Sequence, residues 1–123
     1  MEKEYLYWMK KAESDLRKAD ILKEKCEFDG ATFYSQQTAE KALKAVCLFN
    51  NFGLIKTHDL LILGKKVNLP EKTLEKAIIL NSFYTSSRYP LLIEEQDFSK
   101  ESADKSLLYA EEVLKWCKQQ III

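Results

Sequence analysis

Apolar residues recur at steps of three and four along the first quarter of the chain, and charged residues fill the positions between them. This spacing predicts a long amphipathic helix from Glu2 to about Lys25. Residues 27–30 break the pattern, and the carboxylate of Asp29 can accept hydrogen bonds from the free amides that start a second helix. This second helix is expected to run to about Asn50.

The second helix carries apolar or small side chains over most of its circumference, which predicts a central position with neighbours on more than one side. Its charged and amide side chains follow at helical steps and form one narrow stripe of Gln37, Glu40, Lys41 and Lys44. A stripe of this kind is either solvated or functional.

The middle of the chain predicts a turn followed by a short helix. The sequence Asn-Asn-Phe-Gly over residues 50–53 suits a helix stop, because asparagine and glycine tolerate positive φ. Thr57 suits the N-cap of the short helix, with His58 and Asp59 in its first turn, and leucines supply a buried face up to Gly64.

Two further helices complete the pattern. Pro70 in a first turn opens a fourth helix, which ends before Pro90 because the residue preceding a proline avoids the helical region, so Arg88 lies at a helix C-terminus. After an extended segment over residues 91–98, Ser99 can cap a final helix. The short connections between these elements predict an all-α fold, an up-and-down four-helix bundle with an additional short helix, in a single domain over residues 1–123.

Composition agrees with an all-α protein, since leucine, lysine, glutamate and alanine recur while there are only two prolines and three glycines. Nineteen basic and nineteen acidic residues balance, so the whole chain has no strong field to draw it onto nucleic acid or an anionic membrane. A local basic patch is still compatible with this balance. No apolar run approaches the roughly 18 residues that a membrane span needs, and the N-terminus lacks a secretory pattern, so a cytoplasmic protein is expected.

The three cysteines do not predict a disulfide framework or a zinc site, because they are widely separated and only one histidine could join them. Cys47 and Cys117 fall on apolar helical positions and are expected in the core, whereas Cys26 is uninformative. The carboxylates at positions 94, 95 and 97 lack metal-site spacing, so we expect neither metal nor cofactor. Three isoleucines at 121–123 are either frayed or covered by a partner.

His58 is the candidate catalytic residue, because imidazole can accept or donate a proton near neutral pH. Its structural alternative is a hydrogen bond across the bundle. Arg88 could hold a phosphate, with Tyr89 beside it as a ring for a base or ribose, or it could pair with an ordinary carboxylate such as Glu94 or Glu95.

Lys41 and Lys44 form a basic pair, with Gln37 one turn earlier. Near Arg88 this pair would make an anion site, whereas on a free surface it would be a solvated stripe. The candidate ligand-binding set is therefore Gln37, Lys41, Lys44, Arg88 and Tyr89.

Three blocks of the chain together resemble the HEPN family, small helical domains named for nucleotide binding in higher eukaryotes and prokaryotes. The blocks are Gln-Gln-Thr-Ala-Glu-Lys-Ala-Leu-Lys-Ala from residue 36, Thr-His-Asp-Leu from residue 57, and Ser-Arg-Tyr-Pro from residue 87. The resemblance implies a helical bundle that forms a homodimer. It also implies a partner, a small nucleotidyltransferase encoded beside the domain as a toxin–antitoxin-like pair.

Many relatives in this family are metal-independent ribonucleases in which an arginine is followed, after four to six residues, by a histidine. No histidine follows Arg88 in this chain. The first hypothesis is therefore a protein that binds a nucleotide or a nucleotidyltransferase partner through the neighbourhood of Lys41, Lys44 and Arg88. The alternatives are an atypical ribonuclease that uses Arg88 with His58, and an oligomeric scaffold without a ligand.

Overall fold

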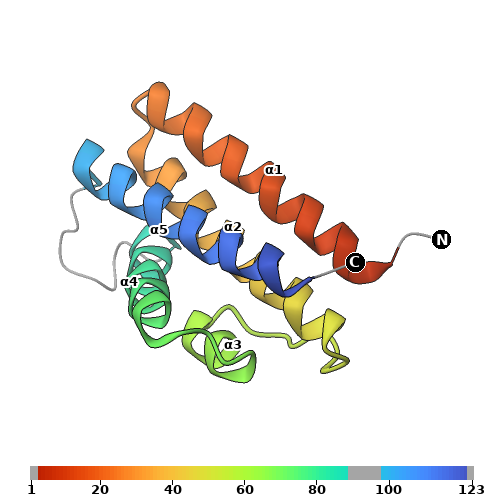
Figure 1. Ribbon diagram of the computed structural model, residues 1–123. Helices are drawn as coiled ribbons and strands as arrows, with labels where there is room; N and C mark the ends of the chain where they lie inside the picture. The colour runs from red at the N-terminus through yellow and green to blue at the C-terminus, as the bar shows by residue number, and fades with distance from the viewer. Residues whose placement is uncertain (1–2, 89–97, 122–123) are drawn as a thin grey trace.

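The computed structural model describes residues 3–88 and 98–121, and for residues 84–88 it describes the backbone alone. Five helices make up the architecture: α1 (Glu4–Glu24), α2 (Phe28–Phe49), α3 (Leu60–Lys66), α4 (Glu71–Arg88) and α5 (Lys100–Gln120) (Figure 1). The described residues contain no strand. The predicted all-α fold of four long helices and one short one is confirmed.

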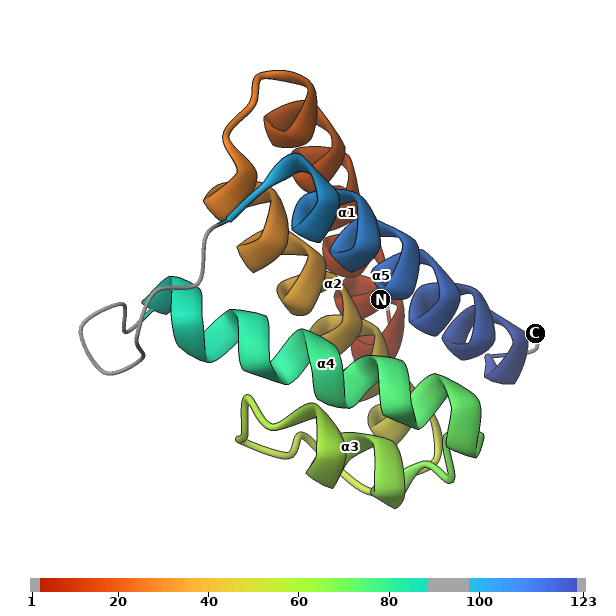
Figure 2. The same ribbon diagram turned by 90° about the vertical axis from the view of Figure 1, so that its left-hand side faces the viewer.

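The long helices alternate in direction, as the bundle prediction requires. α1 and α4 run one way and α2 and α5 run the other, with α4 crossing the bundle and α3 lying against α4 (Figures 1 and 2). Two ion pairs link α1 and α5 in antiparallel register, one from Lys23 to Asp104 at 3.3 Å and one from Lys118 to Glu13 at 3.5 Å.

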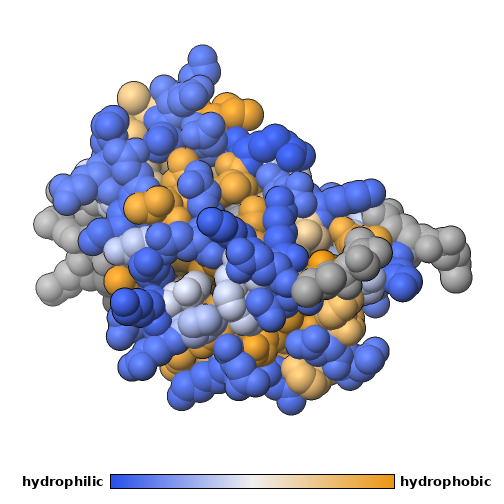
Figure 3. Space-filling view, in the orientation of Figure 1, coloured by the Kyte–Doolittle hydropathy of each residue, from blue (hydrophilic) through white to orange (hydrophobic). Residues whose placement is uncertain are grey.

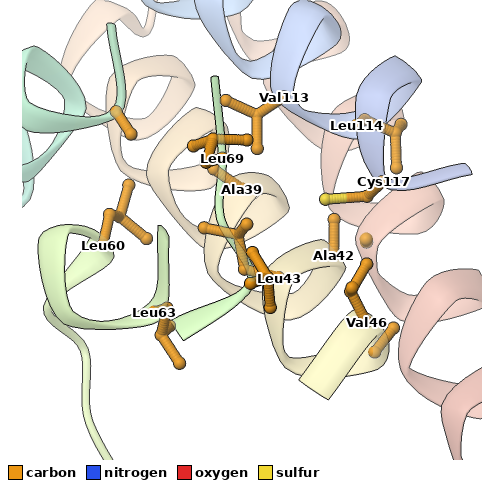
Figure 4. Packing of buried hydrophobic residues seen from close by; sticks show 14 of the residues in the cluster. Ala39, Ala42, Leu43, Val46, Leu60, Leu63, Leu69, Val113, Leu114 and Cys117 are labelled. Carbon is orange, nitrogen blue, oxygen red and sulfur yellow. The ribbon is translucent and has the colours of Figure 1, made fainter. Parts of the chain in front are cut away.

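α2 is the central helix, and it contacts each of the other four. Alanines on several of its faces allow neighbours to approach closely, while Leu43 and Val46 fill the core between them (Figure 4). The surrounding side chains come from α3 and α5, including Leu60, Leu63 and Val113. The predicted central position of this helix is confirmed.

Three helices end in the same hydrogen-bonded motif. After α1, α2 and α3, one residue has positive φ: Cys26 at 61°, Asn51 at 62° and Asn68 at 58°. In each case its amide and the next one donate back to carbonyls of the last helical turn, which satisfies groups that a helix end would leave unpaired. The predicted stop at residues 50–53 is one of these three ends.

Two of the predicted helix starts are wrong by a few residues. α2 begins at Phe28, so Asp29 lies in its first turn and its carboxylate accepts only from the adjacent Gly30 amide, at 2.8 Å. The N-cap of α3 is Asp59, whose carboxylate accepts from the Leu61 amide at 2.9 Å, and not Thr57. The predicted first-turn position of His58 is therefore wrong.

The later boundaries agree with the sequence. α4 is described up to Arg88, where the first described range ends, and Pro70 lies just before its first residue and not within the first turn. Ser99 caps α5 in a reciprocal arrangement with Ser102. Of the extended segment predicted over residues 91–98, only residue 98 is among the described residues. Of the three C-terminal isoleucines, only the one at position 121 is described.

Two cysteines belong to the core, as predicted. Cys47 on α2 and Cys117 on α5 are both fully buried, and burial raises the pKa of each thiol. Cys26 is exposed. Within residues 3–88 and 98–121, no helix has the length and apolarity of a membrane span, and no group of three potential metal ligands is found.

Candidate functional site

Glu40 is the centre of the candidate site. It lies on α2 four residues after Gln36 and four before Lys44, so the three side chains share one face of the helix. Only 4% of the Glu40 side chain is exposed. Its Oε2 accepts a hydrogen bond from Lys44 Nζ at 2.9 Å, and its Oε1 pairs with His58 Nδ1, also at 2.9 Å.

The Glu40 contact fixes the tautomer of His58. An ionised carboxylate can only accept, so Nδ1 donates to it and the neutral imidazole carries its proton there, which leaves Nε2 as the second functional nitrogen. Gln36 Nε2 donates to the backbone carbonyl of His58 at 3.1 Å. Both the ring and the backbone of His58 are thus held by α2, while 65% of its side chain is exposed.

Asn81 on α4 holds the residues that follow His58. Its Oδ1 accepts from the Leu60 amide at 2.8 Å, and its Nδ2 donates to Asp59 Oδ1 at 2.7 Å. The same Asp59 oxygen caps α3. The segment before α3 therefore lies between two helices, held by α2 at His58 and by α4 at the next two residues.

Lys41 faces a second carboxylate on a different helix. Its Nζ donates to Oδ2 of Asp15 on α1 at 2.5 Å, and only 2% of the Asp15 side chain is exposed. Lys44 lies over the ring of Trp8, 5.7 Å from its centroid, in addition to its bond with Glu40. Two lysines and two buried carboxylates therefore neutralise each other beneath the site.

The polar stripe predicted on α2 is half buried, so it is not the fully solvated stripe that was one of its two interpretations. Glu40 and Lys44 are buried, and Gln37 donates to Gln36 Oε1 at 2.7 Å and, more weakly, to Glu40 Oε1 at 3.5 Å. The structure brings Gln37, Lys44 and His58 together around Glu40. Lys41 points to α1 instead, although 24% of its side chain stays exposed.

Arg88 is the last residue of α4, and its side chain is outside what the structure describes, as is the whole of Tyr89. The backbone nevertheless places Arg88 in the fold. It follows Asn81 by seven residues, which is close to two helical turns, so the two positions lie on the same face of α4, about 10 Å apart along the axis. Arg88 therefore continues the helix face that binds the residues next to His58.

Three features of the site are not predicted by the sequence pattern. The pattern makes Glu40 one member of a stripe and not its centre, and it assigns no partner to Asp15 or Asn81. The spacing of Gln36, Glu40 and Lys44 at steps of four is the available signal. Their partners on other elements leave no local pattern.

A separate groove lies between α1 and α5, on a face where apolar side chains show among charged ones (Figure 3). It has a volume of about 410 Å³, with Leu16 and Leu114 among its lining residues. Lysines and a glutamate from α5 border it. None of the candidate residues whose side chains the structure describes lines this groove.

The chain is similar to a family model and to two solved structures. A family model described as HEPN domain matches residues 5–120. The crystal structure of TT1696 from Thermus thermophilus is similar over 98% of this chain and 100% of its own, with 25% identity and a TM-score of 0.89. The structure of ST0689, an archaeal HEPN homologue, is similar over 99% and 100%, with 33% identity and a TM-score of 0.84. Among curated proteins no significant match is found.

Proposed function

Because this chain belongs to the HEPN family, we propose that it binds a nucleotide at the surface formed by His58 and the C-terminal turn of α4. The observation that carries the proposal is the pairing of an exposed imidazole with a buried carboxylate. Such a partner orients the ring, and a protonated ring held in this way can donate from Nε2 to an anion. Arg88 supplies the permanent positive charge that a phosphate group requires.

The lysines and the glutamine of the candidate set have a supporting role in this proposal. The charges of Lys41 and Lys44 are each compensated by a carboxylate at hydrogen-bonding distance, so they add little net attraction for a phosphate. Lys44 and Gln37 instead hold Glu40 in place behind His58. Tyr89 follows Arg88 directly in the chain and is the ring proposed to stack on a base or ribose.

The family relationship also supports a proposal about assembly. We propose that the protein acts in the cytoplasm as a homodimer and as the HEPN component of a toxin–antitoxin-like pair with a small nucleotidyltransferase. Light scattering after size exclusion tests the dimer, with a mass of one 14.4 kDa chain as the contradicting result. Co-purification with a nucleotidyltransferase encoded beside the gene tests the pair, and separate elution of the two proteins contradicts it.

Isothermal titration with ATP and GTP tests nucleotide binding. Loss of one charge-assisted hydrogen bond costs about 1.5–3 kcal/mol, so Arg88→Ala and His58→Ala should each weaken binding by roughly 10- to 100-fold. Lys72→Ala is the matched control, because it removes an exposed lysine from the opposite end of the same helix. The absence of binding by the parent protein, or equal losses in all three variants, would contradict the proposal.

The same imidazole geometry favours a second function, a metal-independent ribonuclease. A general base needs a ring nitrogen that is held in a fixed orientation, and the Glu40 contact provides this for His58. Arg88 would then stabilise the charge on the reacting phosphate. Cleavage of a short RNA in the presence of a chelator, lost in His58→Ala and Arg88→Ala, is the expected result, and intact RNA with the parent protein contradicts it.

The third hypothesis, a scaffold without a ligand, has its own outcome in these assays. It predicts a dimer that neither binds nucleotides or RNA in titration nor cleaves RNA. The three hypotheses are thus separated by one set of purified proteins.

A further inference from the structure

Asn81 on α4 binds the start of α3 through both polar groups of its side chain. Its carbonyl oxygen accepts from the Leu60 amide, and its amide nitrogen donates to Asp59, which caps α3. Both bonds are short, at 2.8 and 2.7 Å. They tie α4 to the residues that directly follow His58 in the chain.

The bonds of Asn81 add a directional link between α4 and the start of α3 to the packing of α4 against α2, α3 and α5. His58 is held by α2, through Gln36 at its carbonyl and Glu40 at its ring. Arg88 is part of α4, and helical register puts it on the Asn81 face two turns further on. The two hydrogen bonds of Asn81 therefore connect the helix that carries Arg88 to the segment that contains His58.

We propose that Asn81 is a positioning residue that sets the distance and orientation of α4, and so of Arg88, relative to His58. The inference rests on the proposed function, because its consequence is the affinity for a nucleotide held by both residues. A side-chain amide suits this role, since its oxygen accepts a hydrogen bond from a backbone amide while its nitrogen donates one to a carboxylate. A site held by rigid elements loses affinity when its supporting contacts are removed, even where the contacting residues are intact.

A purely structural role for Asn81 would stabilise α3 without affecting the site. The two roles are separated with Val67→Ala, a matched control that removes buried volume just after α3 and leaves Asp59 and Leu60 untouched. Asn81→Ala removes both hydrogen bonds. Asn81→Asp retains the oxygen that accepts from Leu60 but brings a second carboxylate against Asp59.

Titration with ATP is the first measurement. We expect Asn81→Ala and Asn81→Asp to weaken binding about tenfold, while Val67→Ala stays within about twofold of the parent. In an Arg88→Ala background, Asn81→Ala should have no further effect, because the residue it positions is gone. Parent affinity in Asn81→Ala, or a loss that adds in full to that of Arg88→Ala, would overturn the inference.

A second measurement does not depend on a ligand. His58 is the only histidine in the chain, so its imidazole nitrogens give a single, assignable set of NMR signals. These signals should shift in Asn81→Ala and not in Val67→Ala, because only the first variant removes the hydrogen bonds from α4 to the residues next to His58. Unchanged signals in Asn81→Ala would overturn the positioning role, whereas shifted signals in a protein that binds no nucleotide would support positioning and refute the proposed function.

Discussion

Replacing Glu40 by glutamine tests the buried charge pair at the centre of the site. The substitution keeps the size and shape of the side chain but removes the negative charge that faces Lys44 Nζ at 2.9 Å. Only 8% of the Lys44 side chain is exposed, so its ammonium group would be left without a carboxylate in a site that water hardly reaches. The cost therefore comes from an unpaired charge and not from a cavity.

The size of the effect follows from the burial of both groups. Removing one partner of a buried ion pair destabilises a protein by about 3–5 kcal/mol. The glutamine oxygen still accepts one hydrogen bond, and the Trp8 ring remains near Lys44, so the expected loss for Glu40→Gln is about 2–4 kcal/mol. For a domain of this length such a loss lowers the melting temperature by about 10 °C.

Urea unfolding followed by circular dichroism measures this loss as a change in midpoint at constant m-value. Glu111→Gln, on the exposed side of α5, is the control and should stay within about 0.5 kcal/mol of the parent. The double variant Glu40→Gln with Lys44→Met should recover part of the stability, because no charge remains unpaired. A single variant as stable as the parent, or a double variant less stable than the single one, would refute the reasoning.

Four other predictions concern the Lys41–Asp15 ion pair and the three cysteines. Lys41→Met leaves the buried Asp15 carboxylate with only an exposed lysine 3.7 Å away, so urea unfolding should show a loss of about 1–3 kcal/mol, and a loss below about 0.5 kcal/mol would contradict the pairing. Cys26→Gly should raise stability by about 0.5–1 kcal/mol, because φ is 61° there, and an unchanged unfolding midpoint would argue against strain. Iodoacetamide should label Cys26 alone in the native protein, since Cys47 and Cys117 are buried with raised thiol pKa values, and two or more labels would contradict this. Burial raises the pKa of both thiols in the folded protein, so the unfolded chain loses these protons at lower pH, near the ordinary cysteine pKa of about 8.5. Stability should therefore fall as pH rises above that value, and a flat profile from about pH 8 to 10 would count against it.

Helical periodicity is enough to predict the fold, because the spacing of the apolar positions that each long helix buries is local information. Helix starts were harder. Thr57 and Asp59 are both good capping residues two positions apart, and the choice between them depends on Asn81, which lies over twenty positions away. Local sequence does not contain that contact. The predicted start of α3 is therefore wrong, and so is the predicted position of His58 in its first turn.

The candidate site was predicted in part, for a similar reason. A charged stripe on a helix is ordinarily solvated, yet here Glu40 and Lys44 are covered by α1 and by the segment before α3. The partners that permit their burial, Trp8 and His58, belong to other elements. Spacing within α2 predicted which residues share a face but not which of them would be buried.

The polar side chains of Gln36, Glu40 and Lys44, spaced four apart on α2, limit which substitutions the protein can accept. Glu40 accepts from Lys44 and pairs with His58, while Gln36 holds the His58 carbonyl, so a change at any one position leaves a polar group inside the protein unmatched. Substitutions accepted during evolution should therefore come as joint changes across 36, 40, 44 and 58, or not at all. Aligned relatives should show these positions varying together, while the exposed positions of the same bundle drift independently.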